Sequence, residues 1–305
     1  MGEREERVIA PGPLRPGRGR VWVRRAVAAA ALAGTLGVAG WAGATLLRNE
    51  DPPPPPTETE PPLARLRVIF PEGFTVREMA DRVDAVRQIA IDQRGVTPRL
   101  TRQGYLDATG RAIPPPAFRR DWDGRSIEGF LFPATYEFSQ YTSSAALVRD
   151  QLRHFRRQWS TIDLRYARSK ILTPYDVLVI ASMIEKEAAA PEERRLVSAV
   201  IYNRLRAGMP LGIDATIRYG RNIPGTEPLK RSDIETDHPY NTRRRPGLPP
   251  TPIANPGLAS LRAAADPAPV DYLYFVRKPD KVHHFFTASE SEFCRKSLEY
   301  GYGGC

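Results

Sequence analysis

The strongest constraint on how this chain can fold lies near its N-terminus, where residues 26–47 carry no charged side chain. The length of this stretch, AVAAAALAGTLGVAGWAGATLL, suits a membrane-spanning helix better than the shorter apolar core of a signal peptide. Seven arginines precede it against three glutamates, whereas mostly acidic residues follow it. Because basic residues favour the cytoplasmic side, we expect a cytoplasmic tail over 1–25, a single anchor over 26–47 and the rest outside the cytoplasm. A cleavable signal ending near the AGA of residues 42–44 is the alternative.

The segment behind the predicted anchor is a spacer. Residues 48–63 include five consecutive prolines at 52–56. Such a run favours an extended polyproline conformation, and a disordered tether would have the same effect of holding the following domains away from the membrane. The whole chain has a formal net charge of +10, which suits an anionic polymer or lipid surface. Because no zinc-finger spacing, RNA-binding signature or phosphate loop occurs, we expect no nucleic-acid partner.

Cysteine and histidine give little sign of a metal site. The only two cysteines, Cys294 and Cys305, both lie near the C-terminus, where an oxidising exterior would allow them to close a short disulfide loop. The four histidines are scattered along the chain. We therefore expect neither a metal nor a cofactor.

Local patterns predict several elements after the spacer. The stretch RLRVIFPEGFTVREMADRV indicates a strand, a turn and a helix whose capping box joins Thr75 and Glu78. We assign residues 64–115 to a small α+β module. Residues 127–138 are rich in aromatic side chains and predict a strand broken at Pro133, and residues 145–159 predict a helix with a basic face. Near the C-terminus, VDYLYFVRK and HHFFTAS predict two strands joined by a turn at 279–280.

Two helices separated by a proline occupy the middle of the chain. Thr173 is a good N-cap and Pro174 suits the first helical position, so the first helix should run from 174 to about 189. Pro191 then starts a second helix, which should stop at Gly208. Loops rich in glycine and proline follow from residue 211, and such loops often build binding clefts.

The end of the first helix carries two glutamates, Glu185 and Glu187, within ASMIEKEAAAPEERR. Residues two apart on a helix point to nearly opposite sides, so we expect one carboxylate to face the protein and the other the solvent. Glu187 shares a face with Ile180 and Met183, and three alanines leave space beside it. This favours a cleft position for Glu187, although Leu178 and Ala181 form a similar face for Glu185. A carboxyl group in an apolar cleft has a raised pKa and can donate its proton to a glycosidic oxygen.

Four blocks in this order resemble one family. They are IEGFLFPATY, the stretch ASMIEKEAAAPEERRLVSAVIYNRLRAGMPLGIDATIRYG, then PYNTRRRPGLPPTPIANPG and YLYFVRKPDKVHHFFTAS. Together, behind an N-terminal anchor, they are similar to the YceG-like family of endolytic murein transglycosylases. The resemblance spans roughly residues 64–300.

This resemblance implies an α+β fold with a LysM-like module over 64–115 and a catalytic domain over 116–305. It also implies a lyase that cuts nascent peptidoglycan strands between N-acetylmuramic acid and N-acetylglucosamine. The new end would be 1,6-anhydro-muramic acid, and the cut would terminate strand elongation. The implied partners are peptidoglycan glycan strands and the cytoplasmic membrane, with peptidoglycan synthases as candidates.

The resemblance also assigns residues. Glu187 matches the family's catalytic glutamate. The candidates for positioning sugar or stabilising charge are Glu128, Asp214, Tyr219, Tyr240 and Asn241, each of which could equally be structural. Ala215 stands where a proline is common in the family, and the Arg-Arg-Arg run at 243–245 is unusually basic for its loop.

Two other functions remain compatible with the sequence. A non-catalytic peptidoglycan-binding scaffold of the elongation machinery would keep the anchor and the module without needing Glu187. An ordinary glycoside hydrolase would use two carboxylates and release a reducing end.

Overall fold

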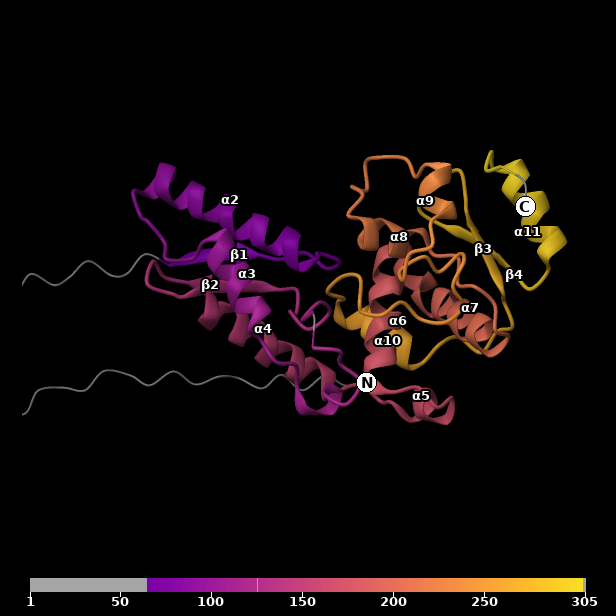
Figure 1. The fold of residues 1–305 in the computed structure, drawn as a ribbon, viewed down its shortest axis with the longest axis horizontal. Helices are drawn as coiled ribbons and strands as arrows, with labels where there is room; N and C mark the ends of the chain where they lie inside the picture. Colours follow the sequence, from indigo (N-terminus) through magenta and orange to yellow (C-terminus); the bar gives the residue numbers. More distant parts are fainter. Residues whose placement is uncertain (1–64, 125, 304–305) are drawn as a thin grey trace, which may run out of the picture. The chain divides into compact units, whose positions relative to one another are not determined.

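The computed structural model describes residues 65–124 and 126–303. The predicted anchor at 26–47 and the spacer at 48–63 lie outside these residues. Within the described ranges, no helix has both the length and the apolar character needed to cross a bilayer. The described residues belong to one compact unit. Their helices and short sheets confirm the predicted mixed α+β class (Figure 1).

The first elements form a β-α-α-β arrangement. They are β1 (Leu66–Ile69), α2 (Val76–Arg94), α3 (Arg102–Gly110) and β2 (Thr135–Phe138). Strands β1 and β2 pair antiparallel, with Leu66 opposite Phe138. Helix α2 begins with the predicted capping box, in which the Thr75 hydroxyl accepts the Glu78 N–H at 3.2 Å and the Glu78 carboxylate accepts the Thr75 N–H at 2.7 Å. Both bonds satisfy donors that the helix start would otherwise leave unpaired.

This arrangement extends beyond the boundary that we placed at residue 115. Strand β2 comes from 135–138, and helix α4 (Ser144–Trp159) packs against α3. The predicted strand over 127–138 is therefore correct only at its end. Residues 127–132 are buried but irregular, because Gly129 adopts a φ of +89° and the Leu131 N–H donates to the Asn255 side chain at 2.9 Å instead of to a strand.

Helix α6 (Pro174–Glu187) is the buried centre of the elements that follow α4. It starts as predicted, with Thr173 as the N-cap and Asp176 completing a capping box. It ends at 187 rather than 189, because Ala188 adopts an extended conformation. The short 3₁₀ helix η2 (Pro191–Glu193) and helix α7 (Arg194–Arg206) follow. Helix α10 (Leu258–Ala265) packs against both α6 and α7 (Figure 1).

The remaining elements surround this helical centre. They are η1 (Pro116–Phe118), α5 (Arg165–Ser169), α8 (Asp214–Arg221) and α9 (Arg231–Glu235). The predicted C-terminal strands form an antiparallel hairpin, β3 (Tyr274–Arg277) with β4 (His284–Thr287), and α11 (Glu290–Glu299) packs on it. Cys294 in α11 is disulfide-bonded. Its predicted partner, Cys305, lies outside the described residues.

Candidate active site

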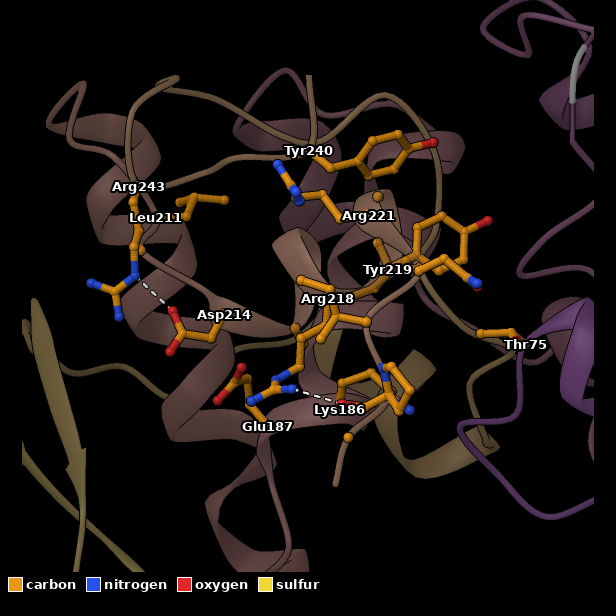
Figure 2. Close-up of a pocket in the computed structure, with 18 of the residues that line it drawn as sticks. Thr75, Lys186, Glu187, Leu211, Asp214, Arg218, Tyr219, Arg221, Tyr240 and Arg243 are labelled. Carbon is orange, nitrogen blue, oxygen red and sulfur yellow. Dashed lines mark hydrogen bonds and ion pairs between the residues drawn. The ribbon is translucent and has the colours of Figure 1, made fainter. Parts of the chain in front are cut away.

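A cleft of about 1780 Å³ passes over the end of α6 (Figure 2). Its walls come from the N-terminal end of α2, from α8 and the loops around it, and from the β3–β4 hairpin. Five of the six predicted site residues line it: Glu128, Glu187, Asp214, Tyr219 and Tyr240. Segments that are far apart in the sequence therefore meet around one cavity.

Glu187 reaches this cleft because it is the last residue of α6. The preceding turns of the helix are buried apolar side chains, which fix the direction in which the helix end points. Glu187 keeps partial exposure through the cleft but is otherwise surrounded by protein. This burial, followed by the negative charge of Asp214, raises the pKa of Glu187 to about 7. A carboxyl group with such a pKa exchanges a proton readily near neutral pH.

Several groups oppose this rise. The positive charges of Arg277 and Arg243 and a hydrogen bond from the backbone N–H of Ala215 lower the pKa of Glu187. Ala215 lies in the first turn of α8, where unpaired N–H groups favour a negative charge. Asp214 begins the same helix and accepts a hydrogen bond from Arg243 Nε at 2.6 Å (Figure 2). Glu187 therefore faces both carboxylate and guanidinium charges.

Tyr219 and Tyr240 form an aromatic part of the wall. Their ring centroids are 5.3 Å apart with an interplanar angle of 54°. The Tyr240 hydroxyl is 2.7 Å from Thr251 Oγ1, and the Tyr219 hydroxyl donates to Glu128 Oε2 at 3.3 Å. These hydrogen bonds hold the two rings in place, and both side chains line the cleft.

Glu128 lines the cleft but is already bonded to the protein. Only 3% of it is exposed. Besides Tyr219, its carboxyl accepts the Val76 N–H at 3.0 and 3.1 Å and the Asn255 side-chain amide at 2.6 Å. Burial raises the pKa of Glu128 to about 8. These contacts tie the start of α2 to α8 and to the loop before α10, which favours the structural role that we considered for this residue.

Asn241 does not line the cleft. It is fully buried, and its side-chain amide donates to the carbonyls of Ile234 and Thr236 at 2.8 and 2.7 Å. Its side-chain oxygen accepts the Arg243 N–H at 3.1 Å. The structure therefore places Asn241 inside the loop that carries Arg243, where it supports the cleft wall from behind.

The expectation that Glu185 or Glu187 faces solvent is wrong. The Glu185 side chain is only 7% exposed, and it accepts the Gly257 N–H at 2.9 Å with Arg194 Nη2 at 4.0 Å. Gly257 is the N-cap of α10, so Glu185 stabilises the start of that helix. The two glutamates do point in different directions, but helix α10 covers the side of α6 that carries Glu185.

The sequence profile of the YceG-like family matches residues 54–298. The chain belongs to the YceG-like family. It is 38% identical over 153 residues to an endolytic murein transglycosylase of Bacillus subtilis (strain 168), covering 50% of this chain and 42% of that protein. It is 29% identical over 259 residues to the endolytic murein transglycosylase of Streptococcus pneumoniae serotype 2 (strain D39 / NCTC 7466), covering 79% of this chain and 45% of that protein. The chain thus spans less than half the length of these curated relatives.

A crystal structure supports the same family. A putative yceG-like protein from Listeria monocytogenes superposes with a TM-score of 0.59 at 26% sequence identity, and the match covers 76% of each chain. The superposition therefore extends over most of the residues described in this YceG-like protein.

Two charged residues at this YceG-like site were not predicted from the sequence. Arg243 lies in the basic run that we noted without assigning a role, and Arg277 lies in β3, which we predicted only as a strand. Their proximity to Glu187 depends on the tertiary fold. Within the described part of the chain, no cluster of three or more histidine, cysteine, aspartate or glutamate side chains could hold a metal ion.

Proposed function

We propose that this protein is an endolytic peptidoglycan lytic transglycosylase in which Glu187 is the acid and then the base. The observation that carries the proposal is the carboxyl of Glu187, which lines a large cleft and has a pKa of about 7. Membership of the YceG-like family and the names of the curated relatives support the same activity.

In the first step, protonated Glu187 donates its proton to the glycosidic oxygen between N-acetylmuramic acid and N-acetylglucosamine. The bond between the muramyl C1 and that oxygen breaks, and positive charge develops on the muramyl ring. The N-acetylglucosamine side leaves with a new hydroxyl group. Because protonated Glu187 is available near neutral pH, this step needs no second carboxylic acid.

In the second step, the Glu187 carboxylate accepts the proton of the muramyl 6-hydroxyl. The oxygen of that hydroxyl attacks C1 and closes a 1,6-anhydro ring, so no water is consumed and Glu187 regains its proton. The carboxylate of Asp214 is suited to stabilise the positive charge that develops between the two steps. Arg243, which pairs with Asp214, holds this carboxylate in place.

Other parts of the cleft are suited to binding the strand. The paired rings of Tyr219 and Tyr240 offer a stacking surface, and the cleft, at about 1780 Å³, has the volume for more than one sugar, as an endolytic enzyme requires. The β-α-α-β order of β1, α2, α3 and β2 supports the assignment of the N-terminal module as LysM-like and glycan-binding. With the strand bound by the cleft and the module, the enzyme would cut nascent strands and so terminate their elongation.

We also propose that the protein is anchored in the cytoplasmic membrane by residues 26–47, with the cleft outside the cytoplasm and near peptidoglycan synthases. An alkaline phosphatase fusion after residue 62 tests this topology. The fusion should be active and should remain in the membrane fraction. Inactive phosphatase, or release of a processed protein, would contradict the anchor.

Product analysis tests the chemistry. Purified full-length protein in detergent is incubated with uncrosslinked glycan strands in ¹⁸O-labelled water, and the products are weighed by mass spectrometry. We expect internal cuts whose new ends are one water lighter than a reducing end and carry no ¹⁸O. Reducing ends with ¹⁸O would identify a hydrolase, and intact strands would favour the non-catalytic scaffold.

A further inference from the structure

A buried histidine–glutamate pair that the proposed mechanism does not use lies beside the same cleft, and its histidine lines the cavity. His284 begins strand β4 and Glu193 ends η2. The Glu193 carboxylate accepts the His284 backbone N–H at 2.9 Å, and its other oxygen lies 2.7 Å from His284 Nδ1. Only 2% of the His284 side chain and 8% of the Glu193 side chain are exposed. Burying such a pair is costly unless its geometry is well satisfied, so its presence beside the cleft needs an explanation.

The imidazole ring of His284 has one fixed orientation. Phe275 lies perpendicular to it with ring centroids 5.3 Å apart, and Phe286 lies 6.0 Å away. A carboxylate can only accept hydrogen bonds, so Nδ1 carries the proton toward Glu193. In the neutral ring, Nε2 is then a hydrogen-bond acceptor.

This second nitrogen opens on the cleft. His284 lines the same cavity as Glu187. Within the described residues, Nε2 has no hydrogen-bond partner, and it is not among the fully enclosed polar atoms that lack one. Arg277, the direct partner of His284 across the hairpin, is close enough to Glu187 to lower its pKa. The ring therefore belongs to the wall of the cleft that holds the reacting carboxyl.

We propose that His284 contacts the glycan through Nε2, which accepts a hydrogen bond from a sugar hydroxyl near the bond to be cut, and that Glu193 is the positioning residue that holds the ring. This inference rests on the proposed function. Sugars offer many hydroxyl donors, whereas this part of the wall is rich in arginine donors that cannot accept them. An acceptor in a fixed orientation would help select one placement of the strand beside Glu187.

Two amide substitutions separate this role from a purely structural one. In His284→Asn, the short amide can still donate to Glu193 but places no atom at the position of Nε2. In His284→Gln, the longer amide reaches that position but gives up the bond to Glu193. His283→Asn is the matched control, because His283 is the exposed neighbour and pairs with Asp280 and Glu192 instead.

Two quantities are measured for each full-length variant in detergent: the rate at which it cleaves glycan strands and its melting temperature. We expect His284→Asn to melt near the wild type but to cut about tenfold more slowly, as befits the loss of one hydrogen bond. His284→Gln should melt lower yet keep most of the rate, and His283→Asn should match the wild type. If His284→Asn cuts as fast as the wild type, or if rate follows melting temperature across the variants, the inference is overturned.

A second measurement keeps His284 unchanged, so its result does not depend on whether the His284 variants fold. In full-length Glu187→Gln labelled with ¹⁵N-histidine, glycan strands should shift the Nε2 resonance of His284 and leave that of His283 in place. An unmoved His284 resonance at saturating glycan would overturn the inference. If the proposed function itself were wrong, the wild type would leave the strands intact. This outcome differs from an unmoved His284 resonance combined with cleavage by the wild type.

Discussion

The backbone N–H of Ala215 donates a hydrogen bond to the carboxyl of Glu187, which joins the first turn of α8 to the last residue of α6. This contact favours the charged form of Glu187, whereas burial and Asp214 favour the protonated form. The positive charges of Arg277 and Arg243 act in the same sense as this contact, and the pKa of Glu187 of about 7 is the balance of all these contributions. Changing one contributor at a time should therefore move the pH dependence of cleavage in a direction that can be stated beforehand.

Ala215→Pro should move the alkaline limb of the pH–rate profile upward. Proline has no N–H, so the Glu187 carboxylate loses a donor and its pKa rises. Cleavage that needs protonated Glu187 should then persist to higher pH, by roughly one pH unit. Proline is tolerated in the first turn of a helix, and the family resemblance gives proline as common at this position, so the fold should be kept. Cleavage rates from pH 5 to 9 check this, and a limb that stays in place would exclude the role of this N–H.

Asp214→Asn should move the same limb in the opposite direction. Removing the negative charge lowers the pKa of Glu187, and Arg243, no longer paired with a carboxylate, acts in the same sense. The rate at pH 8 should fall more than the rate at pH 6. Asp214 is also proposed to stabilise positive charge, so the maximal rate should decrease too. An upward shift would show that Asp214 does not act on Glu187 as described.

Glu128→Gln should reduce the pH dependence of stability. Burial raises the pKa of Glu128 from about 4.5 to about 8 in the folded protein. The folded state therefore binds more protons than the unfolded state between these values, and its stability falls as the pH rises through them. Glutamine is neutral in both states, so the urea midpoint should decrease less between pH 5 and 8 than in the wild type. The exposed Glu137→Gln is the control, and an equal pH dependence in Glu128→Gln and the wild type would refute the prediction.

Local chemistry predicted the ends of several elements correctly. The capping box at Thr75 and Glu78, the start of α6 at Pro174 and the hairpin before α11 all follow from residues that are neighbours in the sequence. The pairing of β1 with β2 was not predicted, because those strands are joined through two helices and a loop. Sequence spacing cannot show which distant backbone a strand will meet.

In the site, too, features set by neighbouring residues were predicted and those set by distant segments were not. The helical face around Ile180 and Met183 was enough to favour Glu187 as a cleft residue. The burial of Glu185 was missed because it depends on α10, which starts about 70 residues later and covers that side of α6. Arg277 and His284 likewise come to line the cleft only because the fold brings the C-terminal hairpin to it.

Cys294 should show no free thiol in the protein prepared without reductant, because it is disulfide-bonded. A disulfide that closes a short loop typically contributes about 2–3 kcal/mol, so reduction should lower the urea midpoint modestly. Labelling of the denatured, non-reduced protein with a thiol reagent checks this. Two reactive thiols per chain would contradict both the bond and the pairing with Cys305 that we predicted from the sequence.

The most direct test of the account compares Glu187→Gln with Glu185→Gln for cleavage of glycan strands at pH 6.5. Glutamine keeps the shape of either side chain but cannot transfer a proton. Glu187→Gln should fold, bind the strands and lose activity by about 10²–10⁴-fold. Glu185→Gln should keep most of the activity with a small loss of stability, since its oxygen can still accept the Gly257 N–H. Cleavage at the wild-type rate by Glu187→Gln, in properly folded protein, would contradict the assignment of Glu187 as the acid.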